Sequence, residues 1–182
     1  MTKAHRTPGA VVVCADRSAA AHHALRWGVA EAGRRKAPLY VVACGERASE
    51  PPNSVIADAI AAVRTSISGL PILGGHPHGP VVDTLRELSA DAAAVVVPAT
   101  LAELPDVVAA SFCPVVTVPE PTPRSEDSNG PVVLGAASWS VEEVFDLAFC
   151  EAAERRAGLV AVRTWSDPLI DTGSRASTRV QR

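Results

Sequence analysis

The stretch VVVPATLAELPDVVAASFCPVVTVP, from Val95 to Pro119, holds the plainest fold signal in the chain. Two short apolar runs, at 92–99 and 114–119, flank a segment with helical spacing from about Pro105 to Phe112. Apolar runs of strand length separated by a helix are typical of parallel strands that are buried on both faces. The prolines around the second run favour a short strand at the edge of the sheet.

The same alternation extends back to the start of the chain. Strands are predicted at 9–16, 38–45 and 70–77, and helices at 19–36, 55–68 and 79–91. The resulting order, β-α-β-α-β-α-β-α-β, predicts an α/β fold with a doubly wound parallel sheet and helices on both faces. We expect this first domain to cover residues 1–120.

A second, shorter unit follows a segment that is rich in proline, serine and acidic residues. That composition predicts a linker at 121–130. EAAERRAGLVAVR (151–163) then aligns without a gap with EAGRRKAPLYVVA (31–43), which indicates an internal repeat. We expect a partial β-α-β unit over 131–168 and a disordered tail over 169–182.

Composition excludes several classes of function. The chain has 182 residues, a net charge of −3 and no Lys/Arg block, so nucleic acid and anionic membranes are not expected partners. Its apolar runs are of strand length, well short of the roughly 20 residues of a membrane span. The N-terminus carries no apolar signal segment, and the four cysteines form no C-x-x-C pair. These features predict a cytoplasmic protein with reduced thiols.

Four stretches resemble the universal stress protein family in its tandem-domain form. They are VVVCADRSAAAHHALRWGVAEAGRRKAPLYVV, GHPHGPVVDTLRELSADAAAVVV, CPVVTVP and GPVVLGAASW…VRTWSDP, and they cover nearly all of 9–120 and most of 130–168. The resemblance implies a five-stranded parallel sheet in the order 3-2-1-4-5, the adenine nucleotide alpha hydrolase-like fold. It also implies dimerisation through the fifth strand.

The resemblance breaks down where ATP-binding members of the family hold phosphate. Those members carry Gly-x-x-Gly and a later Gly-Ser or Gly-Thr after strand four, because backbone N–H groups gather the phosphate oxygens there. Here PATLAELPD follows that strand, and Pro98 has no N–H to offer. The sequence therefore predicts a module without ATP or another cofactor, not an enzyme. We expect it to act in stress response or regulation through protein–protein association.

Asp16 matches the aspartate that lies beside adenosine in the nucleotide-binding members. Two interpretations are open: a cap on the turn into Ser18, or a surviving ligand contact at the crevice between strands one and four. The alternative function is a stress protein with an altered phosphate loop that binds adenosine or AMP. It would use Asp16 and the backbone of strand two near Val41. The second copy has Ala136 or Ala137 in place of Asp16.

Three other arrangements of residues could form sites, but the sequence does not favour them. The first is a metal site of His22, His23, His76 and His78, since adjacent helical side chains diverge by about 100°. The second is a small-molecule hydrolase using Ser18 with His22 or His78, since no Gly-x-Ser-x-Gly elbow exists. The third is a disulfide between Cys14 and Cys44 on strands that neighbour each other in the family order. Such a bond strains adjacent parallel strands, so buried free thiols are expected.

The predicted fifth strand is the expected contact with a partner. The partial second unit lacks an edge strand of its own, so PVVTVP is left for a second chain. We predict a homodimer, or another protein partner, through Val115, Val116, Thr117 and Val118.

Overall fold

The computed structural model describes residues 8–44, 52–64, 69–75, 79–121, 130–137, 140–163 and 179–181. The chain divides into two compact units, residues 1–123 and 124–182, and each is considered by itself. The division falls inside the segment expected as a linker, of which residues 122–129 lie outside the described part. In the described part, no helix combines the length and the apolar character that a membrane crossing needs.

The first unit is built on one five-stranded sheet. Its strands are β1 (Val11–Ala15), β2 (Leu39–Ala43), β3 (Ile72–Gly75), β4 (Ala94–Pro98) and β5 (Val115–Val118). All neighbouring strands run parallel, in the order β3-β2-β1-β4-β5. The predicted fold class and strand order are confirmed.

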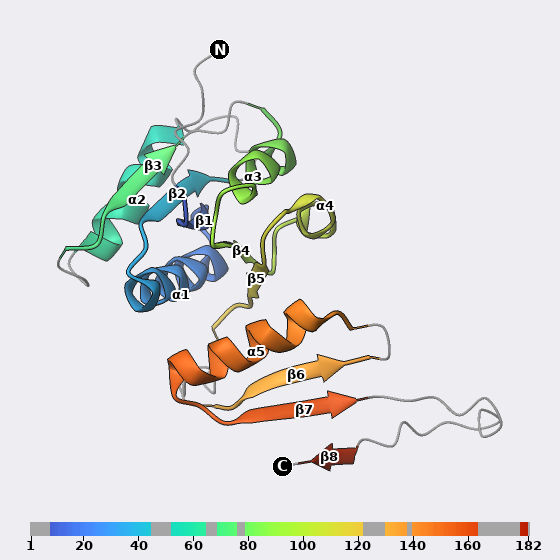
Figure 1. Cartoon of the computed structure of the whole chain (residues 1–182). Helices are drawn as coiled ribbons and strands as arrows, with labels where there is room; N and C mark the ends of the chain where they lie inside the picture. The colour runs from blue at the N-terminus through green and yellow to red at the C-terminus, as the bar shows by residue number, and fades with distance from the viewer. Residues whose placement is uncertain are drawn as a thin grey trace. The chain divides into compact units, whose positions relative to one another are not determined.

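Helices cover both faces of this sheet. They are α1 (Ala19–Arg35), α2 (Pro52–Arg64), α3 (Val81–Ser89) and α4 (Leu104–Ala110). Figure 1 shows α1 and α2 on one face and α3 and α4 on the other, and the two apolar clusters divide in the same way. Every residue of β1, β2 and β4 is buried, as their continuous apolar runs predict.

Alternation along the strands decides which side chain faces which pair of helices. Val11 and Val13 of β1 join the cluster beneath α1 and α2, whereas Val12 and Cys14 join the cluster beneath α3 and α4. Helix α1 lies close to β1 because Gly28 has no side chain, and a Cβ built there would overlap the side chain of Val13.

The second unit contains β6 (Val132–Ala136), α5 (Glu142–Arg155), β7 (Leu159–Arg163) and β8 (Arg179–Gln181). Strands β6 and β7 pair in parallel on either side of α5 in the chain, which makes residues 132–163 a β-α-β segment. Strand β8 is a difference, because it pairs antiparallel with β7 within the tail expected to be disordered. A three-residue strand gives no recognisable pattern in the sequence, and its partner is chosen by tertiary contact. Most of that tail lies outside the described residues.

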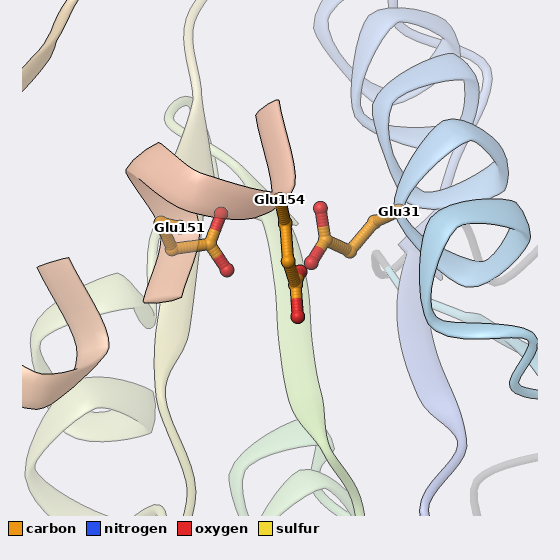
Figure 2. A group of neighbouring side chains, drawn as sticks. All are labelled: Glu31, Glu151 and Glu154. Atoms are coloured by element: carbon orange, nitrogen blue, oxygen red, sulfur yellow. The ribbon is translucent and has the colours of Figure 1, made fainter. Parts of the chain in front are cut away.

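The repeat is visible in the backbone where α1 and α5 end. Lys36 and Arg156 both adopt the left-handed conformation, with φ of 52° and 53°. In each case the next residue donates its N–H to a carbonyl five residues back, at 2.9 Å in both units. Figure 2 shows the matching glutamates, Glu31 on α1 and Glu151 on α5. The two stretches that align without a gap thus share this local backbone geometry.

Candidate functional site

The connector between β4 and α4 occupies the place where a phosphate loop would lie. Strand β4 ends at Pro98, which is buried, and α4 begins at Leu104. The backbone N–H of Ala99 donates to the carbonyl of Val118 at 2.8 Å, and that of Leu101 donates to Pro98 at 3.0 Å. In the short connector predicted from the sequence, the N–H groups of Ala99 and Leu101 are therefore already bonded to neighbouring carbonyls.

Helix α4 adds little to this turn as an anion site. It has only seven residues, and Pro105 stands in its first turn without an N–H. The first backbone N–H groups of a helix are what attract phosphate, so a proline there weakens the site. Leu104 also donates its N–H to the carbonyl of Leu101, at 3.2 Å.

Asp16 begins the turn from β1 into α1. A carboxylate oxygen of Asp16 accepts the backbone N–H of Ser18 at 2.6 Å, and the Ser18 hydroxyl accepts the N–H of Ala21 at 3.0 Å. Ser18 is the N-cap of α1. The interpretation of Asp16 as a cap on the turn is confirmed. The Asp16 side chain is only half-buried, so a ligand could still reach it, and the ligand contact stays a prediction.

Val41 lies in the middle of β2, completely buried. It is paired with Val13 on one side and Gly74 on the other, so its backbone belongs to the sheet ladder. The strand ends two positions later, at Ala43. A contact between adenosine and the Val41 backbone stays a prediction.

A small pocket opens beside Asp16, between the end of β1 and helices α1 and α2. Its volume is about 190 Å³, below the roughly 300–1,000 Å³ of most small-molecule sites. Asp16, Arg17, His22 and Asp58 supply its polar lining. Arg17 reaches from the turn to α2, where it donates to Asp58 at 3.2 Å and to Ser54 at 3.3 Å. Sequence reasoning missed this contact, because its partners are 41 residues apart and neither belongs to a motif.

The two described histidines of the candidate metal site, His22 and His23, contact different backbone carbonyls. His22 Nδ1 contacts the backbone carbonyl of Ser18 at 2.8 Å, and His23 Nδ1 contacts that of Pro119 at 3.0 Å. His22 therefore meets the Ser18 carbonyl and not its hydroxyl, which caps α1. The other two histidines of that candidate metal site, His76 and His78, lie outside the described residues.

The prediction of free thiols at Cys14 and Cys44 is wrong in this structure, because the two form a disulfide. The reason is their stagger. Cys14 pairs in register with Val42, so Cys44 lies two residues further on, just past the end of β2. Their Cα atoms are 5.6 Å apart, inside the usual disulfide range of about 4.4–6.8 Å. Cys113 and Cys150 are free thiols.

Strand β5 is the outer strand of the sheet on the β4 side. Val95 and Ala99 donate their N–H groups to the carbonyls of Pro114 and Val118. Backbone direction alternates along a strand, so Val116 also faces β4 while Val115 and Thr117 turn their backbone groups outward. The side chain of Thr117 is exposed.

No model of a known protein family matches the chain, and a search of curated proteins finds no significant relative. Solved structures do match. One is a universal stress protein in complex with cAMP, at 21% identity and a TM-score of 0.53, covering 63% of this chain and 99% of its own. The first unit has the universal stress protein fold.

Two further structures support that fold. The universal stress protein from Archaeoglobus fulgidus in complex with dAMP is 21% identical, with a TM-score of 0.51 over 60% of this chain and 97% of its own. A protein described as a universal stress protein from Pseudomonas aeruginosa is 17% identical, with a TM-score of 0.60. That match covers 92% of this chain and 65% of the Pseudomonas protein, so it extends into the second unit.

Proposed function

We propose that this chain is a universal-stress-protein-like module that does not bind ATP. It acts in stress response or regulation through protein–protein association, not as an enzyme, and its setting is the cytoplasm. The observation that carries the proposal is the closed turn after β4. Pro98 offers no donor there, and the N–H groups of Ala99 and Leu101 are already used.

The first test compares ATP, ADP and AMP by isothermal titration calorimetry. Binding of ATP through its triphosphate needs several free N–H donors, which would make ATP bind more tightly than AMP. We expect no heat of binding for ATP and no gain from the β- and γ-phosphates. Micromolar affinity for ATP that exceeds the affinity for AMP would overturn the proposal.

Association is assigned to β5. An edge strand presents unpaired N–H and C=O groups to a second chain, and here the outward groups belong to Val115 and Thr117. The partial second unit, which repeats β1-α1-β2 alone, offers no counterpart of β5 within the described residues. We therefore propose a homodimer in which two β5 strands pair.

Thr117→Pro tests this interface, because proline removes an outward N–H while leaving the ladder to β4 intact. Light scattering at high concentration should show a dimer for the native chain and a monomer for the variant. Thr117→Val is the matched control, since it retains the N–H and should remain a dimer. A native chain that is monomeric, or a dimer that tolerates Thr117→Pro, would contradict the interface.

A second candidate function is the binding of adenosine or AMP. Two structural neighbours were solved with cAMP and dAMP, and Asp16 stands at the edge of a pocket large enough for a ribose-sized group. Calorimetry with AMP tests it on Asp16→Asn and Asp16→Ala. The asparagine retains an oxygen to cap Ser18, so it separates loss of a charged ligand contact from loss of the cap. Absence of AMP binding by the native chain removes this candidate.

A further inference from the structure

The disulfide between Cys14 and Cys44 lies at the carboxyl edge of the sheet. Cys14 is fully buried near the end of β1, two residues before Asp16. Cys44 follows β2 directly and is 7% exposed, which makes its sulfur the more approachable of the two. The bond therefore joins the ends of two neighbouring strands on the sheet face that α3 and α4 cover, opposite the pocket that Asp16 lines.

The fold accommodates this pair in both oxidation states. The backbone N–H of Cys44 donates to the carbonyl of Ala15 at 2.8 Å, and five residue pairs hold β1 and β2 in register. The two strands thus stay together without the sulfur–sulfur bond. Both cysteines belong to the apolar cluster under α3 and α4, where free thiols would pack as small hydrophobic groups.

We propose that Cys14 and Cys44 form a reversible thiol–disulfide couple that responds to low-molecular-weight thiols and disulfides. In the oxidised state the bond locks the end of β1 to the end of β2. In the reduced state those ends are held by backbone hydrogen bonds alone. This proposal does not depend on the function proposed above, since it concerns the cysteines and their exchange partner only.

The exchange proceeds in two steps. The Cys44 thiolate attacks one sulfur of a low-molecular-weight disulfide, forms a mixed disulfide and releases one thiolate. The Cys14 thiolate then attacks the Cys44 sulfur and releases the second thiolate. The two protons lost by Cys14 and Cys44 are taken up by the departing thiolates. The protein pair is oxidised by two electrons, and the small disulfide is reduced to two thiols.

The locked state bears on the pocket because Ala15 and Asp16 line it. On its far side the pocket is bounded by α2, which Arg17 ties to the same turn through Asp58. The disulfide restrains the end of β1 from the opposite face of the sheet, and the ion pair restrains the turn that carries Asp16. Reduction removes the covalent half of that restraint and leaves the exposed ion pair, which is weak on its own.

The test equilibrates the full-length native protein in mixtures of reduced and oxidised glutathione, quenches it with acid, and alkylates it after unfolding. Peptide mass spectrometry then counts free thiols at each cysteine. We expect Cys14 and Cys44 to change together, from fully alkylated to fully protected, as the mixture becomes oxidising. Cys113 and Cys150 serve as internal controls and should not become linked to each other.

Two outcomes would overturn the proposal. Alkylation of Cys14 and Cys44 in the most oxidising mixture would show that no couple forms. Retention of the bond in excess reduced glutathione, with the protein still folded, would show a permanent structural disulfide.

A second measurement tests how much the disulfide stabilises the fold. The melting temperature of the native protein should fall by roughly 10 °C on reduction, because the bond closes a loop of 30 residues. The Cys14→Ala/Cys44→Ala variant should lose this dependence, whereas Cys150→Ala should retain it. If the double variant does not fold, the thiol titration of the native chain still decides the matter.

Discussion

The β1-α1-β2 segment and the β6-α5-β7 segment share their local geometry but differ sharply in burial. Both helices end in a left-handed residue, and both strand pairs are parallel over five residue pairs. All residues of β1 and β2 are buried, whereas Leu134 is the only buried residue of β6 and β7 has none. Strand β1 has β2 and β4 beside it, whereas among the described strands β6 has β7 as its one neighbour.

The difference teaches that the sequence of a β-α-β unit is enough to set its helix end and its strand pairing. It is not enough to bury the strands. Burial of β1 comes from β4 and from the pair α3 and α4 on the second face, which have no counterpart in the described part of the second unit. A sheet needs three or more strands and a covered face for independent stability. In the described part of the second unit, the third strand is β8, which begins 16 residues after the end of β7.

The largest effect on stability is expected from truncating a side chain of α3 that covers the sheet. Leu85 of α3 is completely buried over the sheet, so Leu85→Ala should lower the free energy of unfolding by about 3–5 kcal/mol. Leu134→Ala in β6 should cost less, about 1–3 kcal/mol, because the structure around it can relax more easily. Urea denaturation, with hydrogen exchange followed separately in each unit, measures both. Equal losses would contradict the comparison.

The next effect concerns the contact between helix and strand. Gly28 of α1 corresponds to Ala148 of α5, and both are buried. Gly28→Ala should cost about 1–3 kcal/mol, because the new methyl group overlaps the side chain of Val13. Val13→Ala should recover part of that loss in the double variant, which a double-mutant cycle by thermal unfolding measures.

The matched change in the second unit tests the same comparison from the other side. Ala148→Gly should cost about 1 kcal/mol from helix propensity alone. A neutral or stabilising effect of Gly28→Ala would contradict the close contact between α1 and β1 at this position.

A smaller effect distinguishes the two glutamates in Figure 2. Glu31 accepts hydrogen bonds from both Arg34 and Arg35, whereas Glu151 accepts from Arg155 four residues further on. Glu31→Gln should therefore cost about 1–2 kcal/mol and Glu151→Gln less than about 1 kcal/mol. Unfolding at low and high salt measures the difference, and salt should reduce the Glu151 effect more. A larger loss at Glu151 would reverse the expected order.

The smallest expected effects are gains. Lys36 and Arg156 hold a left-handed conformation that costs a residue with a Cβ about 1 kcal/mol. Lys36→Gly and Arg156→Gly should each raise stability by up to about 1 kcal/mol, and Lys36→Ala should leave it nearly unchanged. Differential scanning calorimetry resolves these shifts. Destabilisation by glycine at either position would show that the cap is not left-handed in solution.

Much of the site could be predicted from local sequence, and some of it could not. Pro98 and the short connector follow directly from the residues after β4, because proline always lacks an N–H. The cap at Ser18 follows from its position just before an apolar helix. The pairs Cys14–Cys44 and Arg17–Asp58 join residues 30 and 41 positions apart, so their distance depends on how strands and helices pack.

The sequence by itself determined the alternation of strands and helices, the similarity between residues 31–43 and 151–163, and the absence of a glycine loop after β4. These are local properties, since hydrophobic period, capping residues and proline act on neighbouring positions. Tertiary structure alone decided that Cys44 reaches Cys14, that Arg17 ties the first turn to α2, and that β8 pairs antiparallel with β7. Each depends on stagger or packing between distant segments, which no local pattern encodes.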